Sequence, residues 1–497
     1  MNDIYISKPL LELVSELENV QVKLPTVDKL LSVGESLEEL DSIEIKGIIF
    51  DSRDVLQGAL FCALKGGKDD GHDYVEAAKK KGAKAALVEH LVEVDIVQIV
   101  VKNSREAMAK ISSKFFGNPS EHLITIGVTG TNGKTSVTYI LKSILNTKGM
   151  GVSLVGTLGG ARTTPESPTI QRIMYDAVHA GKKAVIMEVS SHALVQHRVD
   201  GIKFDVVAFT NLSQDHLDFH KDMESYFQAK SILFEPERAT TAIVHTGDKW
   251  GQRLGQLIRE DGSVLLISVD HSEASDIKAV GGGVKFRFRE KDVSLDWGGL
   301  VGVENAIMAA NIASALGIDD EVIARGISGA RAVPGRFQVV VSKASGTPLV
   351  VIDYAHTPQA LATTLRSARA ISDGELIVVF GCGGNRDRDK RPLMGEKASE
   401  LADVVIVTSD NPRDEDALEI ITQITDGVNK EESILIVEPD REEAIRKAIN
   451  MARAGDVVVI AGKGHEITQN FGDKVIRFDD QEVARRVFLN RLNHEEA

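Results

Sequence analysis

A glycine-rich turn between an apolar run and a helical pattern constrains this chain more than any other feature. The apolar run covers 123–128, the turn reads Gly-Val-Thr-Gly-Thr-Asn-Gly-Lys-Thr over 127–135, and the helical pattern covers 136–147. A strand that turns through glycines into a helix presents backbone N–H groups, a lysine and a hydroxyl to a polyphosphate. The turn therefore predicts a nucleotide-binding site on a strand–helix unit.

The glycine spacing of this turn differs from the strict P-loop pattern. That pattern would place a glycine at Val128, whereas the glycines here are Gly127, Gly130 and Gly133. An ordinary strand-to-helix turn is the alternative. Lys134 and Thr135 occupy the final places of the pattern at the helix start, and they favour the nucleotide-binding interpretation.

Length and composition are typical of a large soluble enzyme. With 497 residues and 43% hydrophobic content, the chain is long enough for about three domains. No run approaches the roughly 18 consecutive apolar residues of a membrane span, and the first residues do not resemble a secretory signal. Cys62 and Cys382 are too few for a disulfide framework or a zinc site. We therefore expect a cytoplasmic protein with reduced thiols and no membrane partner.

The net charge of the chain argues against one class of partner. At −15 it opposes broad nucleic-acid binding, which needs a basic surface. Any phosphate-bearing ligand must therefore meet cations that are placed locally.

Apolar runs separated by polar turns predict an α/β protein of three domains. We expect the domains to cover 1–102, 103–336 and 337–497. The first should be a small α/β domain, the second a P-loop ATPase domain with a mainly parallel sheet, and the third a doubly wound, Rossmann-like domain. Strands are expected at 43–51, 59–64, 85–88, 123–128, 184–189, 206–210, 242–245, 349–352, 376–380, 404–408, 434–437 and 457–460.

Polar segments follow many of these expected strands. Ligands of parallel sheets collect beyond the carboxyl ends of the strands, so these segments are candidate ligand sites. They cover 130–135, 188–192, 211–216, 353–356, 381–386, 410–413 and 462–466. Any one of them could be a turn with a helix cap. Seven such segments at the edges of two sheets are hard to explain by caps alone.

Several of these segments together resemble a known family. The loop 129–135 and the segments 187–192, 211–216, 353–358 and 410–413 are similar to motifs of the Mur ligases of peptidoglycan precursor synthesis, in the same order along the chain. The loop alone is also similar to that of folylpolyglutamate synthases. Within the Mur ligases, the similarity is greatest to members that add meso-diaminopimelate as the third residue of the stem peptide.

The resemblance implies an activity and its partners. It implies an ATP-dependent, Mg²⁺-using ligase of cell-wall biogenesis that forms an amide bond through an acyl phosphate. Its substrates would be UDP-N-acetylmuramoyl-L-alanyl-D-glutamate and meso-diaminopimelate. The protein would be a cytoplasmic monomer that binds no nucleic acid.

The resemblance also implies residues for ATP and the metal. The phosphates of ATP would lie on the loop formed by Gly130, Thr131, Asn132, Gly133, Lys134, Thr135 and Ser136. Asn305, Arg336 and Asp353 would contact the adenine and ribose sides. The family usually has an aromatic residue before this asparagine and a second asparagine three residues after it. This chain has Glu304 and Met308 there, which leaves the adenine packing open.

Four residues would act in catalysis, namely Lys134, Glu188, His216 and Lys230. The resemblance makes Thr135, Glu188 and His216 metal ligands, together with Lys230 in carbamylated form as N6-carboxylysine. By residue type and sequence context alone, Lys230 is typical of a solvated surface lysine.

The nucleotide-sugar substrate would contact the first two domains. The resemblance assigns it to Ser52, between Asp51 and Arg53, and to Gly67, Lys68, Asp69, Thr163, Thr164, Ser190, Gln196 and Arg198. As bare sequence, these segments are also ordinary turn material.

The third domain would bind the amino acid. The resemblance assigns it to Arg386, Asp410, Asn411, Pro412, Arg413, Gly462 and Glu466. Meso-diaminopimelate carries one more carboxylate than lysine, and a half-buried carboxylate needs a charged hydrogen-bond partner. Arg413 would supply that partner, while Asp410 and Glu466 would pair with the far ammonium group. The alternative is a simple turn with Asp410 as a cap.

Three other functions remain open at this point. The first is the L-lysine-adding counterpart in the same family. The second is a folylpolyglutamate synthase-like ligase, which would have no reason to carry the segment 410–413. The third is a P-loop nucleotide-dependent binding module without ligase activity, which would leave the polar strand ends of the third domain unexplained.

Overall fold

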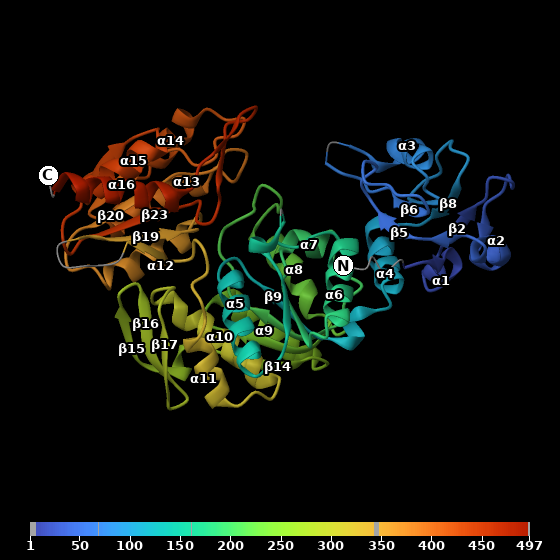
Figure 1. Ribbon diagram of the computed structural model, residues 1–497, viewed down its shortest axis with the longest axis horizontal. Helices are drawn as coiled ribbons and strands as arrows, with labels where there is room; N and C mark the ends of the chain where they lie inside the picture. The colour runs from blue at the N-terminus through green and yellow to red at the C-terminus, as the bar shows by residue number, and fades with distance from the viewer. Residues whose placement is uncertain (1–5, 68, 161, 342–346, 496–497) are drawn as a thin grey trace. The chain divides into compact units, whose positions relative to one another are not determined.

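The computed structural model describes residues 6–67, 69–160, 162–341 and 347–495, which form an α/β protein (Figure 1). The chain divides into two compact units. The first unit comprises 1–127, 150–207 and 232–240, and the second comprises 128–149, 208–231 and 241–497. In the described ranges, every helix is too short or too polar to span a bilayer.

The N-terminal part of the first unit contains a six-stranded sheet in the order β3-β2-β8-β7-β6-β5. The strands are β2 (Gln21–Lys23), β3 (Leu31–Ser32), β5 (Gly47–Ile49), β6 (Ala59–Cys62), β7 (Ala85–Val88) and β8 (Val97–Val100). Strands β5 to β8 are parallel, and β2 is antiparallel to β8. The strands predicted at 59–64 and 85–88 are confirmed as β6 and β7.

Helices cover both faces of this sheet. Leu60 packs in a core with α4 (Ser104–Phe115), while its neighbour Phe61 packs in the opposite core with α3 (Val75–Lys80). Successive side chains of a strand point to opposite faces, so an entirely apolar strand serves both cores.

The single strand predicted at 43–51 is wrong. Two strands occupy this segment and belong to different sheets. Strand β4 (Glu44–Ile45) pairs antiparallel with β1 (Lys8–Pro9), whereas β5 pairs parallel with β6. Between them, the Lys46 N–H donates to the Gly58 carbonyl. An apolar run records burial but not which neighbour the backbone bonds to, so the change of sheet is invisible in the sequence.

The central sheet has six strands in the order β10-β11-β9-β12-β13-β14. The strands are β9 (Ile124–Thr129), β10 (Val152–Val155), β11 (Ala184–Glu188), β12 (Phe204–Phe209), β13 (Ala239–His245) and β14 (Leu265–Val269). Four of them confirm the predictions at 123–128, 184–189, 206–210 and 242–245. The accompanying helices are α5 (Lys134–Thr147), α6 (Ser167–His179), α7 (Ser191–Val195), α8 (Met223–Ser231), α9 (Lys249–Asp261), α10 (Val301–Ala315) and α11 (Asp320–Ser328).

A separate antiparallel sheet of β15 (Ala274–Val280), β16 (Gly283–Phe288) and β17 (Lys291–Leu295) was not predicted. In β16 the buried Val284, Phe286 and Phe288 alternate with exposed Lys285 and Arg287. Such alternation is typical of a sheet with one solvent-exposed face. The prediction rested on continuous apolar runs, and it therefore missed this sheet.

The C-terminal part of the second unit has a six-stranded sheet in the order β18-β19-β23-β20-β21-β22. The strands are β18 (Gln338–Val341), β19 (Leu349–Asp353), β20 (Leu376–Phe380), β21 (Val404–Val407), β22 (Ile434–Val437) and β23 (Val457–Ala461). Strand β18 is antiparallel to β19, and all other pairs are parallel. The five parallel strands confirm the prediction for this part.

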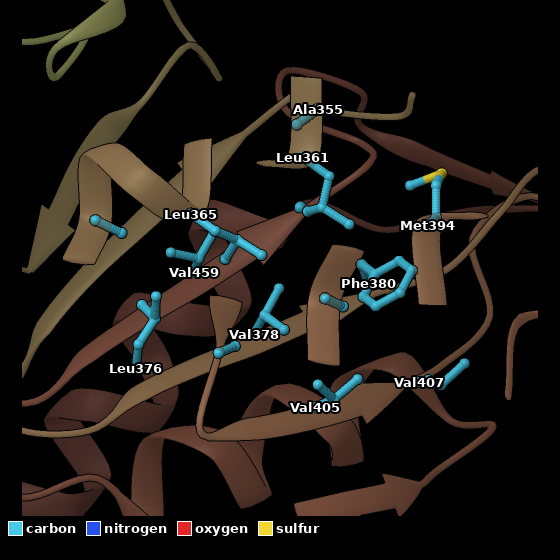
Figure 2. Close-up of a cluster of buried hydrophobic side chains, with 14 of the residues drawn as sticks. Ala355, Leu361, Leu365, Leu376, Val378, Phe380, Met394, Val405, Val407 and Val459 are labelled. Carbon is cyan, nitrogen blue, oxygen red and sulfur yellow. The ribbon is translucent and has the colours of Figure 1, made fainter. Parts of the chain in front are cut away.

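The two faces of this sheet carry separate cores. Figure 2 shows Val378 and Phe380 of β20 with Leu361 of α12 (Pro358–Arg369) and Met394 of α13 (Lys390–Leu401). The alternate residues of β20 pack with α15 (Arg441–Met451) and α16 (Asp480–Glu495) on the other face. The sheet is therefore doubly wound, as predicted.

A fully buried ion pair fastens the last two helices to the strand ends. Arg441 and Asp480 are both 0% exposed, and Arg441 Nη2 lies 2.7 Å from Asp480 Oδ2. Arg441 also donates to the carbonyls of Ala461, at 2.9 Å, and of Ser409, at 3.4 Å. Both carbonyls lie at carboxyl ends of strands. Arg441 therefore holds together two segments of the sheet edge.

We predict that Arg441→Met destabilises the protein by about 3–5 kcal/mol, because Asp480 would remain buried and uncompensated. Urea unfolding measures this change, and the double variant Arg441→Met/Asp480→Leu should recover part of the loss. Arg446→Met removes an exposed arginine from the same helix and should leave the stability nearly unchanged. Equal losses in the two single variants would contradict the prediction.

Candidate active site

The turn after β9 depends on two glycines. Gly130 has a φ of +143°, and a Cβ atom there would lie 1.9 Å from Thr210 Oγ1. Gly133 has a φ of +86°, and its Cβ would lie 2.5 Å from Asn305 Oδ1. Both positions combine a left-handed backbone with no space for a side chain. The structure thus places Asn305 against the loop.

The residues after β12 hold this loop in shape. The backbone N–H of Thr131 donates to the Asn211 carbonyl at 2.9 Å, and that of Asn132 donates to Asn211 Oδ1 at 3.0 Å. Thr210 Oγ1 donates to the Asn132 carbonyl at 2.6 Å. Thr210 and Asn211 were not predicted as site residues, although Asn211 begins one of the polar strand-end segments. The loop is therefore held by fixed partners.

Two lysines converge on one carbonyl oxygen of the loop. Lys134 Nζ donates to Gly130 O at 2.8 Å, and Lys230 Nζ donates to the same oxygen at 2.9 Å. Lys230 comes from α8, is 1% exposed, and lies with Nζ 4.7 Å from the centre of the Tyr226 ring. This burial excludes the alternative of a solvated surface lysine. The structure brings together two residues that are nearly 100 positions apart in sequence.

The environment of Lys230 disfavours its charged form. Burial lowers the pKa of Lys230 well below its usual value, and the nearby Lys134 lowers it further, while Asp215 opposes the shift. The amine is therefore held toward its neutral, nucleophilic form.

Asp215 gathers three basic side chains from separate segments. Its carboxylate lies 3.4 Å from His216 Nε2, 3.4 Å from His356 Nε2 and 3.4 Å from Lys390 Nζ. Burial by itself would raise the pKa of Asp215, but His356, Lys390 and His216 together hold it well below the usual value. Of these residues only His216 was predicted. Asp215 and His356 stand in the polar segments after β12 and β19, and this position is the signal that identifies them.

Arg336 reaches the loop with an unsatisfied donor. Its Nη2 lies 3.4 Å from Thr135 Oγ1, and its guanidinium lies 4.2 Å from the centre of the Tyr354 ring. Its Nη1 is buried and has no hydrogen-bond partner in the described part of the chain. An acceptor atom of a ligand would satisfy this donor.

Asp353 lies at the end of β19 with its acceptors already engaged. It accepts hydrogen bonds from the backbone N–H groups of Phe337, at 2.6 Å, and Ala355, at 2.8 Å. Burial raises the pKa of Asp353, and the bond from Phe337 opposes this shift. Asp353 therefore fixes the turn that carries Arg336.

In the first unit, the structure brings together five predicted residues around Thr164. Thr164 Oγ1 donates to the Glu188 carbonyl at 2.8 Å and accepts from the Ser190 N–H at 3.0 Å. Arg198 donates to the Thr164 carbonyl at 2.8 Å and to Gln196 Oε1 at 2.6 Å. Thr163 joins the group through Thr157, at 3.1 Å between their hydroxyl oxygens.

Glu188 is 1% exposed at the end of β11. It accepts from the N–H and the hydroxyl of Thr157, at 2.9 and 3.1 Å. A Cβ atom on Gly156 would lie 2.2 Å from Glu188 Oε1, so the backbone at 156 must approach this carboxylate closely. The position and orientation of the Glu188 carboxylate are therefore defined by the fold.

Three arginines surround one carboxylate near this group. Glu166 lies 3.0 Å from Arg198, 3.2 Å from Arg105 and 2.6 Å from Arg162. Burial lowers the pKa of Arg198, and its Nε is buried with no hydrogen-bond partner among the described residues. The excess of positive charge suits an anionic ligand. Glu166, Arg105 and Arg162 were not predicted from the sequence.

The remaining substrate residues predicted in the first unit lie in loops after two neighbouring parallel strands. Asp51 and Ser52 follow β5, and Gly67 and Asp69 follow β6. The side-chain hydrogen bond from Arg53 lowers the pKa of Asp51 to about 2. Lys68 lies outside the described residues.

In the second unit, the polar segments after β21 and β23 meet. Gly462 has a φ of +108°, and its Cβ would lie 2.7 Å from Asp410 Oδ2. Asn411 Nδ2 donates to Glu466 Oε2 at 2.8 Å and to Asp410 Oδ1 at 3.0 Å. The sheet therefore brings together four of the predicted amino-acid-binding residues.

Two arginines border the same glycine of the loop after β20. A Cβ atom on Gly383 would lie 2.8 Å from Arg413 Nη1 and 3.7 Å from Arg386 Cγ. Arg413 donates to the Gly384 carbonyl at 2.6 Å, and Arg386 lies 3.6 Å from Asp218. A Cβ atom on Gly384 would lie 1.8 Å from the Pro412 carbonyl oxygen, so this carbonyl also approaches Gly384 closely.

The metal ligands implied by the resemblance are divided between the units. Glu188 belongs to the first unit, and Thr135, His216 and Lys230 belong to the second. Within the described ranges, no cluster of three or more His, Cys, Asp or Glu side chains could hold a metal. Mg²⁺ usually binds through one or two carboxylates plus phosphate oxygens and water, and it does not require such a cluster.

Comparisons with known proteins agree along most of the chain. The Mur ligase family catalytic domain matches 44–116, the Mur ligase middle domain matches 128–313, and the Mur ligase glutamate ligase domain matches 335–464. A relative from Aquifex aeolicus is 41% identical and covers 89% of this chain and 93% of its own length. A relative from Caldanaerobacter subterraneus is 42% identical over 93% of this chain and 98% of its own length.

Both relatives are named UDP-N-acetylmuramoyl-L-alanyl-D-glutamate–2,6-diaminopimelate ligase. A solved structure of a protein with the same name is 29% identical, with a TM-score of 0.64. It covers 91% of this chain and 96% of that protein.

We predict that Lys230→Met raises the free energy of unfolding at about pH 7 in carbonate-free buffer. The pKa of the Lys230 amine is lowered in the folded protein. Below about pH 10.4 this amine therefore binds a proton more readily in the unfolded chain than in the folded protein. Lys230 therefore reduces stability as pH falls from that value, and the gain in the variant should shrink toward about pH 10.

Urea unfolding at the two pH values measures this difference. Lys221→Met removes an exposed lysine before the same helix and should change little at either pH. A Lys230→Met variant that is less stable than wild type at neutral pH would contradict the expected sign.

Proposed function

Because this chain belongs to the Mur ligase family, we propose that it joins meso-diaminopimelate to UDP-N-acetylmuramoyl-L-alanyl-D-glutamate in an ATP-dependent reaction of peptidoglycan precursor synthesis. Family membership follows from the three domain matches and the identity of 41% over 89% of the chain. The observations that support the choice of amino acid are the hydrogen bonds of Asn411 to Asp410 and Glu466 and the bond from Arg413 to the Gly384 carbonyl, beyond the carboxyl ends of strands in the C-terminal sheet. The reaction would take place in the cytoplasm.

The reaction proceeds in two steps. An oxygen of the distal D-glutamate carboxylate attacks the γ-phosphorus of ATP, the bond to the bridging oxygen breaks, and ADP leaves. The amine of the amino acid then attacks the acyl carbon, loses a proton and displaces phosphate. Such chemistry needs mainly positioning and charge neutralisation from the protein.

Lys134 would neutralise charge on the β- and γ-phosphates. Its amine bonds to the carbonyls of Gly130 and Thr131, at 2.8 and 2.9 Å, so it already lies on the loop. Phosphate oxygens are stronger acceptors for an ammonium group than these carbonyls. Arg336, with its unsatisfied Nη1, would supply a second cation at the same loop.

Lys230 would act as a carbamate. Its neutral amine can add to carbon dioxide, forming an N–C bond and releasing a proton. An ammonium group at Lys230 would repel Lys134 on the shared carbonyl oxygen, whereas a carbamate at Lys230 would attract Lys134. The burial of Lys230 and its lowered pKa support this assignment.

Mg²⁺ would be held by oxygen and imidazole donors. Thr135 offers a hydroxyl, Glu188 a buried carboxylate and His216 an imidazole, and the Lys230 carbamate would add an anionic oxygen. This donor set fits a hard divalent cation that also takes phosphate oxygens and water as ligands. When bound, the metal would reduce the repulsion between the phosphate and the substrate carboxylate.

We assign the nucleotide-sugar substrate to the first unit. The group around Thr164 includes Arg198, whose buried Nε lacks a partner among the described residues. Together with Arg105 and Arg162 it offers more positive charge than Glu166 balances. The loops after β5 and β6, with Ser52 and Asp69, would contact the uridine diphosphate end.

We assign the amino acid to the segments after β20, β21 and β23. Arg413 would bind the distal carboxylate of meso-diaminopimelate, and Arg386 would bind another part of the ligand. Glu466 and Asp410 would accept hydrogen bonds from the far ammonium group. Arg413 has a left-handed backbone, with a φ of +55°, and its Nη1 donates to the Gly384 carbonyl.

One assay tests this function and separates it from the alternatives. Phosphate release from ATP should require both the nucleotide-linked dipeptide and meso-diaminopimelate. A folylpolyglutamate synthase would require a folate and glutamate instead, and a binding module would require neither amino acid.

We predict that Lys134→Ala lowers the rate by about 100-fold or more without unfolding the protein. Ligation at the wild-type rate would show that the loop is not the ATP site.

We predict that Arg413→Ala lowers kcat/KM for meso-diaminopimelate about 10- to 150-fold, because the distal carboxylate loses a charged hydrogen bond. Use of L-lysine should fall much less. Arg486→Ala, which removes an exposed arginine from α16, is the matched control and should preserve both rates. A wild-type preference for L-lysine in parallel ligation assays would overturn the choice of amino acid and leave the ligase assignment standing.

A further inference from the structure

A fully buried lysine lies within the proposed amino-acid site and has no role in the reaction as described so far. Lys463 directly follows Gly462 at the end of β23, and its side chain is 0% exposed. Burying an ammonium group is costly unless it is paired and hydrogen-bonded. The fold therefore keeps this ammonium group buried despite the free-energy cost of removing it from water.

The contacts of Lys463 connect it to residues that we assign to the amino acid. Its Nζ donates to the Thr468 carbonyl at 2.6 Å, and lies 3.3 Å from Glu466 Oε2 and 3.4 Å from Asn411 Oδ1. The same Glu466 oxygen accepts from Asn411 Nδ2 at 2.8 Å. Lys463, Glu466 and Asn411 thus form a closed triangle of hydrogen bonds.

A short hairpin supports this triangle from its other side. The Asn470 N–H donates to Asn411 Oδ1 at 2.9 Å, and the Arg413 N–H donates to the Asn470 carbonyl at 3.0 Å. Asn470 and Thr468 are the two ends of β24 (Thr468–Asn470), which pairs with β25 (Val475–Arg477). The position of Lys463 is therefore coupled to the turn that carries Arg413.

We propose that Lys463 is a positioning residue that makes the site select the amino acid with two carboxylates over lysine. It would do so by holding Glu466 and Asn411 in place and by adding a buried positive charge. This inference rests on the proposed function.

The selection follows from the charges of the two ligands. Meso-diaminopimelate and lysine share the far ammonium group, and they differ by the distal carboxylate. A buried positive charge attracts the additional carboxylate, and water screens it little. Without Lys463, Glu466 would lose its ion-pair partner, and its stronger attraction for the far ammonium group would act on both ligands alike. The loss of positive charge would weaken only the binding of the distal carboxylate. The preference therefore shifts toward lysine, and discrimination of this kind is a difference between two affinities.

The experiment compares wild type with Lys463→Met in a competition reaction. Equal amounts of meso-diaminopimelate and L-lysine are supplied with ATP and the nucleotide-linked dipeptide, and the two products are quantified by mass spectrometry. The ratio of diaminopimelate product to lysine product should fall at least about tenfold in the variant. A purely structural role would lower both products in proportion, so an unchanged ratio would overturn the inference.

Two further variants make the outcome decisive. Lys463→Gln removes the charge but keeps a donor for the Thr468 carbonyl, and it replaces the methionine variant if that variant yields no product. In this variant too the ratio of diaminopimelate product to lysine product should fall, and an unchanged ratio would overturn the inference. Lys397→Met removes a lysine that pairs with Glu400 on the surface of α13, and it should preserve the wild-type ratio.

The same experiment separates this inference from the proposed function. If wild type forms no diaminopimelate product, the proposed function fails. If wild type forms it and the Lys463 variants keep the wild-type ratio, only the role of Lys463 fails.

Discussion

Strands that are buried on both faces are the constraint on which the candidate site of this protein depends. In β20, the successive residues Val378 and Val379 pack in different cores. A polar group on either face of the sheet would therefore be buried at a cost in free energy. Chemistry is thereby confined to the carboxyl ends of the parallel strands. The same rule places the phosphate loop after β9, Asp215 after β12 and Asp410 after β21.

Buried charges at these strand ends are held by partners from other segments. Lys463 pairs with Glu466 and donates to the Thr468 carbonyl, and Arg441 is paired with Asp480. Asp215 meets basic groups from three segments, including Lys390. A buried charge retains a defined position because moving it would leave a partner unsatisfied. Such groups suit a reaction that needs positioning and charge neutralisation more than covalent help.

The sequence predicted elements well where burial is continuous and poorly where it is one-sided or changes partners. The apolar runs of β9, β20 and β23 identify those strands without any tertiary information. The alternating pattern of β16 was missed, and the run at 43–51 concealed two strands in different sheets. Periodicity reports which residues are buried, whereas hydrogen-bond partners are set by distant segments.

By itself, the sequence determined the α/β class, the phosphate loop and the polar segments beyond the strands, because each follows from local residue order. The family resemblance then supplied roles for residues such as Lys134 and Arg413. Only the tertiary structure revealed that Lys230 is buried against Gly130, that Glu166 lies among three arginines, and that Lys463 pairs with Glu466 and Asn411. The burial and pairing of a charge depend on residues far away in the chain, and a single sequence contains no local signal for them.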